Sequence, residues 1–369
     1  MKFTQEATAC KRSMTRRRLL LLPGICPLMR EALAAPTHEP QNLSFPLQAI
    51  EGAITPLDLF FVRDHFNEPE LSVSAWKLKI DGRVARPAEL SLADLLESPT
   101  KNLEAVLECA GNTAGGSAVS NAVWEGVPLA YLLRQAGVEP GATMVLLEGA
   151  DSGRLMQDSP SSPYCRLVPI GKCLQPESLI ALKLNDRFLP RRNGFPARAL
   201  FPGWYAMDSV KWLQRITILR SDDPASGLQA SGMNKLYNQI VETAPGNRAV
   251  TRLTGILVKS AIAWPPDNWK LPAGGHEIRG FAWTGAGLVN EVQFSSDGGA
   301  AWTPAKLELA PKPFRWVRWS CLWRASPGEH VLMSRASDDA GNSQLLKRQV
   351  GRKDGYELNF CAPVRCSVQ

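Results

Sequence analysis

The chain has 369 residues, more than one typical domain holds and enough to bury a sizeable core, so two domains are expected. Its formal net charge is +7, from 42 Lys and Arg against 35 Asp and Glu. The first 34 residues contribute +5 of this charge, because they hold seven basic and two acidic side chains. The remaining chain carries only +2, so its charge does not support a basic nucleic-acid-binding face.

The N-terminal segment has the pattern of an export signal. Residues 15–20 read T-R-R-R-L-L, a twin-arginine motif, and an apolar stretch at 19–29 precedes the small-residue cleavage site A-L-A at 32–34. A basic amphipathic helix is the alternative, but Pro23, Gly24 and Pro27 would interrupt it. We expect residues 1–35 to be a Tat signal peptide and the mature protein to be periplasmic. No apolar run reaches the roughly 18 residues that a membrane span needs.

Residues 36–244 predict a mixed α+β domain. Strands are expected at residues 76–80, 103–107 and 210–219, where apolar and β-branched side chains dominate. Helices are expected at residues 92–96, directly after Ser91, and at 128–136. A polar connection at 221–232 then leads to the A-P-G-N turn at 244–247, which marks the predicted domain boundary.

Residues 245–369 predict an all-β domain. Short strands are expected at 256–258, 276–283, 289–295, 301–307, 315–322 and 330–336. Turn sequences separate them, including S-D-G-G at 296–299 and S-P-G at 326–328. This spacing is typical of a β-sandwich, and we expect it to be mainly structural.

Six cysteines lie outside the predicted signal peptide. Apart from Cys109, they are Cys165, Cys173, Cys321, Cys361 and Cys366, an odd number that cannot pair completely within one chain. We therefore predict no essential disulfide framework, although a Cys165–Cys173 pair stays open in an oxidising compartment. The chain has no C-x-x-C-H haem motif and no zinc-type Cys/His spacing.

Cys109 lies between the predicted strand at 103–107 and a turn that contains Gly111, Asn112, Gly115 and Gly116. A thiolate at a strand end can project into a cleft, and sulfur ligands suit metals that carry redox chemistry. Small neighbouring residues also let a bulky cofactor approach the backbone. The alternative, a buried cysteine that packs as a small hydrophobe, is the commoner role of an isolated cysteine.

Several motifs in the same order resemble the sulfite oxidase family of molybdopterin enzymes. They are F-F-V-R-D-H at 60–65, E-C-A-G-N at 108–112, G-F-P-A-R at 194–198 and P-G-W-Y-A-M-D-S-V-K-W at 202–212. The similarity extends from about Leu43 to the C-terminus. It implies a molybdopterin-binding catalytic domain (36–244) followed by an immunoglobulin-like dimerisation domain (245–369), and hence a homodimer.

The resemblance assigns Cys109 as the one protein ligand of a molybdenum that a single pterin also holds through its dithiolene. Arg63 matches a residue that faces the anionic substrate, as suits a planar, permanently charged guanidinium; read alone, it would more often be a surface ion-pair partner. The residues that the resemblance assigns to the cofactor are Phe61, Arg63, His65, Cys109, Asp151, Asn193, Arg198, Ser209, Val210 and Lys211. Among these, Asn193 replaces the histidine usual in the family.

Two further residues are assigned to catalysis. Tyr237 resembles a family tyrosine near the reacting centre. Tyr164 and Tyr205 are competing candidates for this role. Alternatively, Tyr237 only packs between the domains. Arg318 resembles an arginine that reaches the substrate pocket from the second domain, and Arg315 lies close by in the sequence.

One departure concerns the substrate pocket. After C-A-G-N the family commonly has an arginine, whereas this chain has Thr113 and Ala114. The loss of one fixed charge weakens binding of an oxyanion by roughly 1–3 kcal/mol, unless Arg191, Arg192 or Arg318 compensates.

The expected function is oxidation of sulfite to sulfate, with electrons passed to a separate acceptor such as a c-type cytochrome because the chain has no haem motif. The alternatives are reduction of sulfoxides or other oxo-anions, and a non-catalytic interaction subunit.

Overall fold

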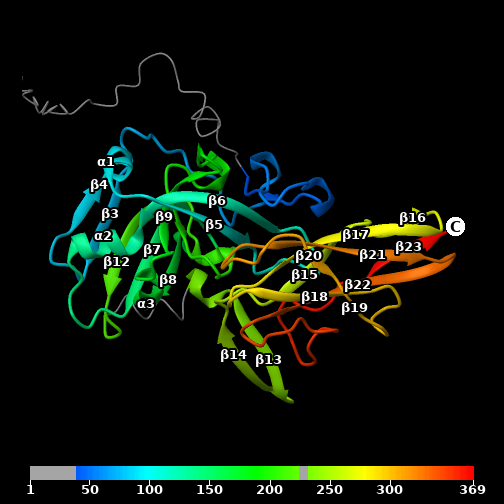
Figure 1. Cartoon of the computed structure of the whole chain (residues 1–369). Coiled ribbons are helices and arrows are strands. Elements are labelled where there is room, and N and C mark those ends of the chain that lie inside the picture. Colours follow the sequence, from blue (N-terminus) through cyan, green and yellow to red (C-terminus); the bar gives the residue numbers. More distant parts are fainter. Residues whose placement is uncertain (1–38, 224–231) are drawn as a thin grey trace, which may run out of the picture.

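The structure, a computed structural model, describes residues 39–223 and 232–369. These residues form two domains that lie side by side (Figure 1). The predicted signal peptide, residues 1–35, lies outside the described residues. No helix in the described part of the chain combines the length and apolar character needed to cross a membrane.

The first domain is built on two five-stranded sheets. One sheet has the order β10 (Arg187–Phe188), β9 (Leu179–Leu184), β6 (Val119–Pro128), β5 (Lys101–Glu108), with β11 (Arg198–Leu200) also pairing with β9. The other has the order β4 (Ala88–Leu90), β3 (Leu78–Gly82), β12 (Leu213–Leu219), β7 (Met144–Gly153), β8 (Ser162–Pro169). Buried Leu, Ile, Val and Trp side chains from both sheets form one apolar core.

The helices of this domain are few and short: α1 (Leu92–Glu97), α2 (Leu129–Ala136) and α3 (Ile170–Cys173). The predicted helices at 92–96 and 128–136 are confirmed. Ser91 and Asp94 form a capping box that starts α1, and Gly137, with φ 68°, ends α2 in the left-handed conformation. The expectation of a mixed α+β domain overstated the helix content, because most connections between strands are turns and short 3₁₀ segments.

The 3₁₀ segments of the described chain are η3 (Leu47–Ala49), η4 (Leu57–Leu59), η5 (Arg191–Asn193), η6 (Ala206–Asp208) and η8 (Gly232–Lys235). Two of them, η5 and η6, contribute residues to the pocket described below. Near the described N-terminus, β1 (Asn42–Leu43) pairs with β2 (Val62–Arg63).

The strands predicted in this domain are confirmed with shifted ends. The strand at 103–107 is the centre of β5, and the one at 76–80 becomes β3. The strand expected at 210–219 begins only at Leu213, because Trp212 has a φ of 48° and interrupts the extended backbone.

The second domain consists of two sheets packed face to face. The first has the order β15 (Lys259–Trp264), β17 (Gly274–Trp283), β21 (Val317–Ala325), β20 (Lys306–Leu307). The second has the order β16 (Trp269–Leu271), β23 (Val364–Val368), β22 (Gly328–Asp338), β18 (Val289–Ser295), β19 (Thr303–Pro304). Buried side chains of both sheets form its core. The strand expected at 256–258 was wrong, because β15 begins at Lys259, and the one at 301–307 is split into β19 and β20.

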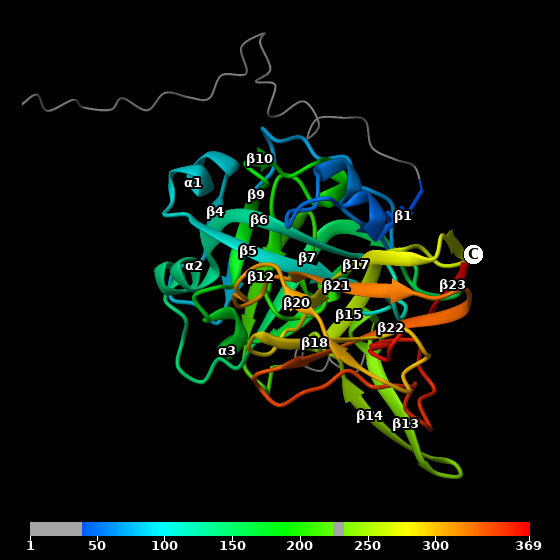
Figure 2. The same ribbon diagram turned by 45° about the vertical axis from the view of Figure 1, so that its right-hand side comes forward.

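A hairpin of β13 (Asn238–Ala244) and β14 (Asn247–Arg252) projects from the body between the domains (Figures 1 and 2). The predicted domain boundary at residues 244 and 245 falls in the turn of this hairpin. The six cysteines of the described chain, all those outside the predicted signal, are unpaired, so the Cys165–Cys173 pair left open by the sequence is not formed.

A third apolar cluster joins the two domains. It combines Tyr205 and Met207 of the first domain with Phe281, Trp283 and Trp316 of the second, all buried. Buried contacts of this kind fix the relative position of two domains more firmly than polar surface contacts do.

Candidate active site

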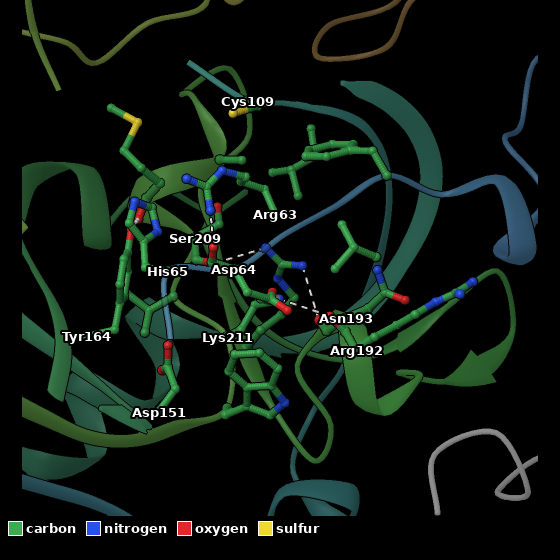
Figure 3. Close-up of a pocket in the computed structure, with 18 of the residues that line it drawn as sticks. Arg63, Asp64, His65, Cys109, Asp151, Tyr164, Arg192, Asn193, Ser209 and Lys211 are labelled. Atoms are coloured by element: carbon green, nitrogen blue, oxygen red, sulfur yellow. Dashed lines mark hydrogen bonds and ion pairs between the residues drawn. The ribbon is translucent and has the colours of Figure 1, made fainter. Parts of the chain in front are cut away.

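A pocket opens in the first domain. Its walls come from β2, the end of β5, β7 and the loops around η5 and η6 (Figure 3). The predicted site residues that line it are Phe61, Arg63, His65, Cys109, Asp151, Asn193, Arg198, Ser209, Val210, Lys211 and Tyr237. The structure thus brings together all the residues assigned to the cofactor.

Arg318 is not among the lining residues. Its Nε lies 3.0 Å from Glu308 Oε2, on the sheet of the second domain. Arg315 instead pairs with Glu104 at 3.2 Å, and Arg191 with Glu68 at 2.8 Å. Of the arginines expected to compensate for Thr113 and Ala114, only Arg192 lines the pocket.

The turn that carries Cys109 is held by Asn112. The Asn112 Oδ1 accepts a hydrogen bond from the Ala118 N–H at 3.0 Å, and its Nδ2 donates to Glu108 Oε1 at 3.0 Å. The Cys109 N–H donates to the Ala118 carbonyl at 2.9 Å. These bonds fix the backbone on both sides of Cys109. In Figure 3, the sulfur lies at the upper edge of the pocket, close to Arg63.

Burial raises the pKa of the Cys109 thiol, against the positive field of Arg63. The side chain is therefore a protonated thiol in the structure as described. A thiol that binds a metal loses its proton, so metal binding at Cys109 would release one proton.

Two cations face the interior of the pocket. Arg198 is buried, and it donates hydrogen bonds to the carbonyls of Asn193 and Ser209 at 3.1 and 2.9 Å. Burial lowers the pKa of Arg198 to about 10, which leaves it charged near neutral pH. Lys211 forms an ion pair with Asp64 and donates to the Arg192 carbonyl at 2.9 Å.

Gly194 allows the loops that carry these cations to meet. It has a φ of 107°, and a Cβ at this position would lie 3.0 Å from the Lys211 Cβ and 3.2 Å from the Arg198 Cβ. Any other residue would be strained by its backbone conformation and crowded by both neighbours. The G-F-P-A-R motif thus has a steric basis.

His65 and Tyr237 are joined by a hydrogen bond of 2.6 Å between the Tyr237 hydroxyl and His65 Nε2. Burial lowers the pKa of His65 to about 3, helped by Arg63, Arg166 and Lys211. The imidazole is therefore neutral near pH 7. Burial also raises the pKa of Tyr237 above its usual range, so this pair holds a neutral phenol and a neutral imidazole. Tyr237 has a φ of 61°, a left-handed conformation that costs about 1–2 kcal/mol.

The competing tyrosines differ in position. Tyr164 lines the pocket beside His65, but its hydroxyl donates to the Met207 carbonyl at 2.8 Å. Tyr205 is fully buried in the cluster between the domains and does not line the pocket.

Asp64, Met207 and Trp212 also line the pocket, although none of them was predicted as a site residue. The motifs contain all three, so their position beside assigned residues was the available signal. Arg166 was also missed: it is buried, pairs with Asp208 at 2.8 Å and lies 5.3 Å from the centre of the Tyr237 ring. No pattern around residue 166 distinguishes it from a surface arginine.

The residues fit a phosphorylated pterin. Three buried polar atoms at the pocket have no hydrogen-bond partner among the described residues: Arg198 Nε, Asn193 Oδ1 and Asp151 Oδ1. Buried polar atoms are normally paired, so these donors and acceptors match a polar ligand. A guanidinium and an ammonium suit a phosphate, whereas the amide and carboxyl oxygens can accept from the N–H groups of a pterin ring.

Burial raises the pKa of Asp151 to about 7, against the pull of Lys211. In Figure 3, Asp151 lies at the lower end of the pocket and Cys109 at the upper end. A bound pterin would thus be held at its ring and phosphate by the first domain, with Cys109 available to a metal at the other end.

Comparisons with known proteins agree with this site. Residues 65–226 match the model of the oxidoreductase molybdopterin-binding domain, and residues 251–348 match that of the Mo-co oxidoreductase dimerisation domain.

The chain is 30% identical over 346 residues to sulfite oxidase of Gallus gallus, covering 86% of this chain and 74% of the relative. It is also 30% identical over 345 residues to mitochondrial sulfite oxidase of Homo sapiens, of which it spans 62%.

The crystal structure of the sulfane dehydrogenase SoxCD from Paracoccus pantotrophus superimposes with a TM-score of 0.77, at 27% identity and 90% coverage of both chains. The matched domains, the relatives and the pocket around Cys109 identify the chain as a molybdopterin oxidoreductase of the sulfite oxidase family.

Proposed function

We propose that this protein oxidises sulfite to sulfate and passes the two electrons to a separate acceptor such as a c-type cytochrome. Overall, sulfite and water give sulfate, two protons and two electrons. The observation that carries the proposal is the position of Cys109 beside Arg63, at the end of a pocket lined by unpaired buried polar atoms.

The bound molybdenum cofactor supplies oxygen-atom transfer and two-electron storage. Arg198 and Lys211 would hold and neutralise the phosphate of the cofactor. Arg63 is exposed at the Cys109 end, where its charge attracts a small oxyanion. Because His65 is neutral, it adds no charge and holds the Tyr237 hydroxyl in place.

The test is metal analysis of protein purified after cofactor-replete expression, together with the absorption change on adding sulfite. Stoichiometric molybdenum and pterin with rapid reduction by sulfite support the proposal. Stoichiometric molybdenum that sulfite does not reduce contradicts the substrate. The non-catalytic subunit considered from the sequence is set aside, because the chain belongs to a family of oxidoreductases.

A second candidate is oxidation of sulfane sulfur. The similarity to sulfane dehydrogenase SoxCD and the uncharged Thr113 and Ala114 favour it, because a less cationic pocket binds a small dianion less well. Turnover of a persulfide or polysulfide substrate, without turnover of sulfite, would support oxidation of sulfane sulfur as the function. Turnover of a sulfoxide by reduced dye would select the reductase expected as the alternative from the sequence.

The remaining proposals concern location and assembly. The twin-arginine motif supports export to the periplasm, and the dimerisation domain supports a homodimer with an immunoglobulin-like second domain. Fractionation of cells before and after replacement of Arg16 and Arg17 by Lys tests export. Analytical ultracentrifugation tests the dimer.

A further inference from the structure

Tyr356 lies beside the Cys109 turn, although it belongs to the segment between β22 and β23 of the second domain. A Cβ at Gly111 would lie 3.9 Å from Cys109 Sγ and 4.0 Å from Cδ1 and Cε1 of Tyr356. Gly111 is exposed, Tyr356 is half-buried, and neither lines the pocket itself. The phenol therefore approaches Cys109 from the solvent side. Residue 356 follows the part of the chain that matches the dimerisation domain, which ends at 348.

The backbone around Tyr356 is anchored at both ends. The Glu357 N–H donates to the Ala110 carbonyl at 2.9 Å, one residue after Cys109. On the other side, the buried Asp354 accepts from the N–H groups of Tyr356 and Ile240 at 3.0 and 2.8 Å. Arg352 pairs with Asp354 at 2.7 Å and donates to the Tyr356 carbonyl at 2.9 Å. The position of the phenol relative to Cys109 is therefore fixed by the fold.

The Tyr356 side chain has a packed ring and a hydroxyl with no internal partner. Its ring centre lies 5.2 Å from that of Tyr237. Within the described residues, the Tyr356 hydroxyl makes no hydrogen bond, whereas the Tyr237 hydroxyl is bonded to His65. Burial raises the pKa of Tyr356, so the hydroxyl keeps its proton near neutral pH and can donate it in a hydrogen bond.

The solvent side of Cys109 otherwise offers few donors to an anion. Thr113 and Ala114 bring no charge to the turn. Arg318 and Arg315 are held in ion pairs of their own, away from the pocket. Among the described residues that line the pocket, Arg63 is the cation beside Cys109, whereas Lys259, which also acts on the thiol, is buried in an ion pair with Glu108.

We propose that Tyr356 is a substrate-binding residue, whose hydroxyl donates a hydrogen bond to an oxygen of a small sulfur oxyanion held between Arg63 and the metal at Cys109. This inference rests on the proposed function and names the contact that replaces a missing charge. The second domain then completes the substrate site as well as supporting the dimer.

The test is steady-state kinetics of Tyr356→Phe as holoenzyme. Removal of the hydroxyl keeps the ring against Tyr237, so the fold and molybdenum content should stay unchanged. We expect KM for sulfite to rise about 10- to 100-fold, the loss of one hydrogen bond to a charged group, with kcat within about twofold. Tyr131→Phe, on α2 and away from the pocket, is the matched control and should leave both constants unchanged.

An unchanged KM, or a fall in kcat with unchanged KM, would overturn the assignment of Tyr356. Sulfate binding to the oxidised holoenzyme, read from its molybdenum absorption, separates this result from failure of the proposed function. If Tyr356→Phe binds sulfate more weakly than wild type but neither protein oxidises sulfite, the oxyanion contact is supported and the sulfite reaction is rejected. Equal binding in the two proteins rejects the contact, and no sulfate binding to wild type rejects both.

Discussion

The Nζ of Lys259 lies 2.7 Å from Oε1 of Glu108, and both side chains are buried between the two domains. Glu108 directly precedes Cys109, and its second oxygen accepts a hydrogen bond from the Trp283 indole at 2.8 Å. Lys259 and Trp283 belong to β15 and β17 of the second domain. The second domain thus holds the strand end from which Cys109 projects.

Replacement of Lys259 by Met should destabilise the protein by about 3–5 kcal/mol, because it leaves the Glu108 carboxylate buried without its ion-pair partner. The double variant Lys259→Met/Glu108→Gln should recover at least half of this loss, since no buried charge remains. Urea titration measures the free energies. Lys353→Met, which breaks the exposed pair with Glu242, is the control and should cost less than about 1 kcal/mol. If Lys259→Met and Lys353→Met lowered the free energy of unfolding equally, the role of burial would be contradicted.

Replacement of Arg198 by Met should reduce retained pterin and molybdenum about 10- to 100-fold, because a charge-assisted bond to a phosphate contributes about 1.5–3 kcal/mol. Without cofactor, the Arg198→Met variant should be as stable as wild type or more so, since the buried guanidinium has no acidic hydrogen-bond partner among the described residues. Cofactor content after dialysis and thermal unfolding measure the two effects. Arg215→Met, an exposed substitution, is the control; full cofactor content in Arg198→Met would place the phosphate elsewhere.

Replacement of Cys109 by Ser should abolish sulfite oxidation while the fold stays intact, because a serine hydroxyl is a poor substitute for a soft thiolate ligand. Circular dichroism checks the fold, and steady-state assays check activity. Cys321→Ser in the second domain is the matched control and should keep activity. Retained activity in the Cys109 variant would remove this sulfur from the metal's coordination.

The protein without cofactor should lose stability as pH rises from about 4 to 7 because of Asp151. In this range the folded state keeps a proton on Asp151, whose pKa is raised from 3.8 to about 7, whereas the unfolded state has released it. The folded state therefore binds more protons, and stability falls with increasing pH.

Asp151→Asn removes this titration. The size of the pKa shift limits the stability that this substitution can restore to about 4 kcal/mol. We expect the free energy of unfolding to increase by about 1–3 kcal/mol at pH 8 and to change little at pH 4. Unfolding titrations of both proteins at the two pH values give the comparison. If Asp151→Asn increased the stability equally at pH 4 and pH 8, Asp151 would not be the source of the pH dependence.

Local features of the fold could be predicted from the sequence. The capping box at Ser91 and Asp94 and the glycine after α2 act within a few residues, and both helices begin and end within one residue of the expected bounds. The strand expected at 256–258 was wrong because Ile256 serves the contact between the domains. It belongs to the buried cluster there, and its N–H donates to the carbonyl of Gly203 in the first domain.

The residues around the pocket were found by motif, since Arg63, Cys109 and Lys211 lie in short conspicuous segments whose order the family resemblance supplied. The sequence motifs, through the family resemblance, thus identified residues that line the pocket, including the Cys109 thiol. Only the tertiary structure decided which side chains approach Cys109 from the second domain. It excluded Arg318, and it brought Lys259 and Tyr356 to the strand end instead. These contacts join residues far apart in the chain, and no local propensity or spacing specifies which of many similar side chains will meet once both cores have packed.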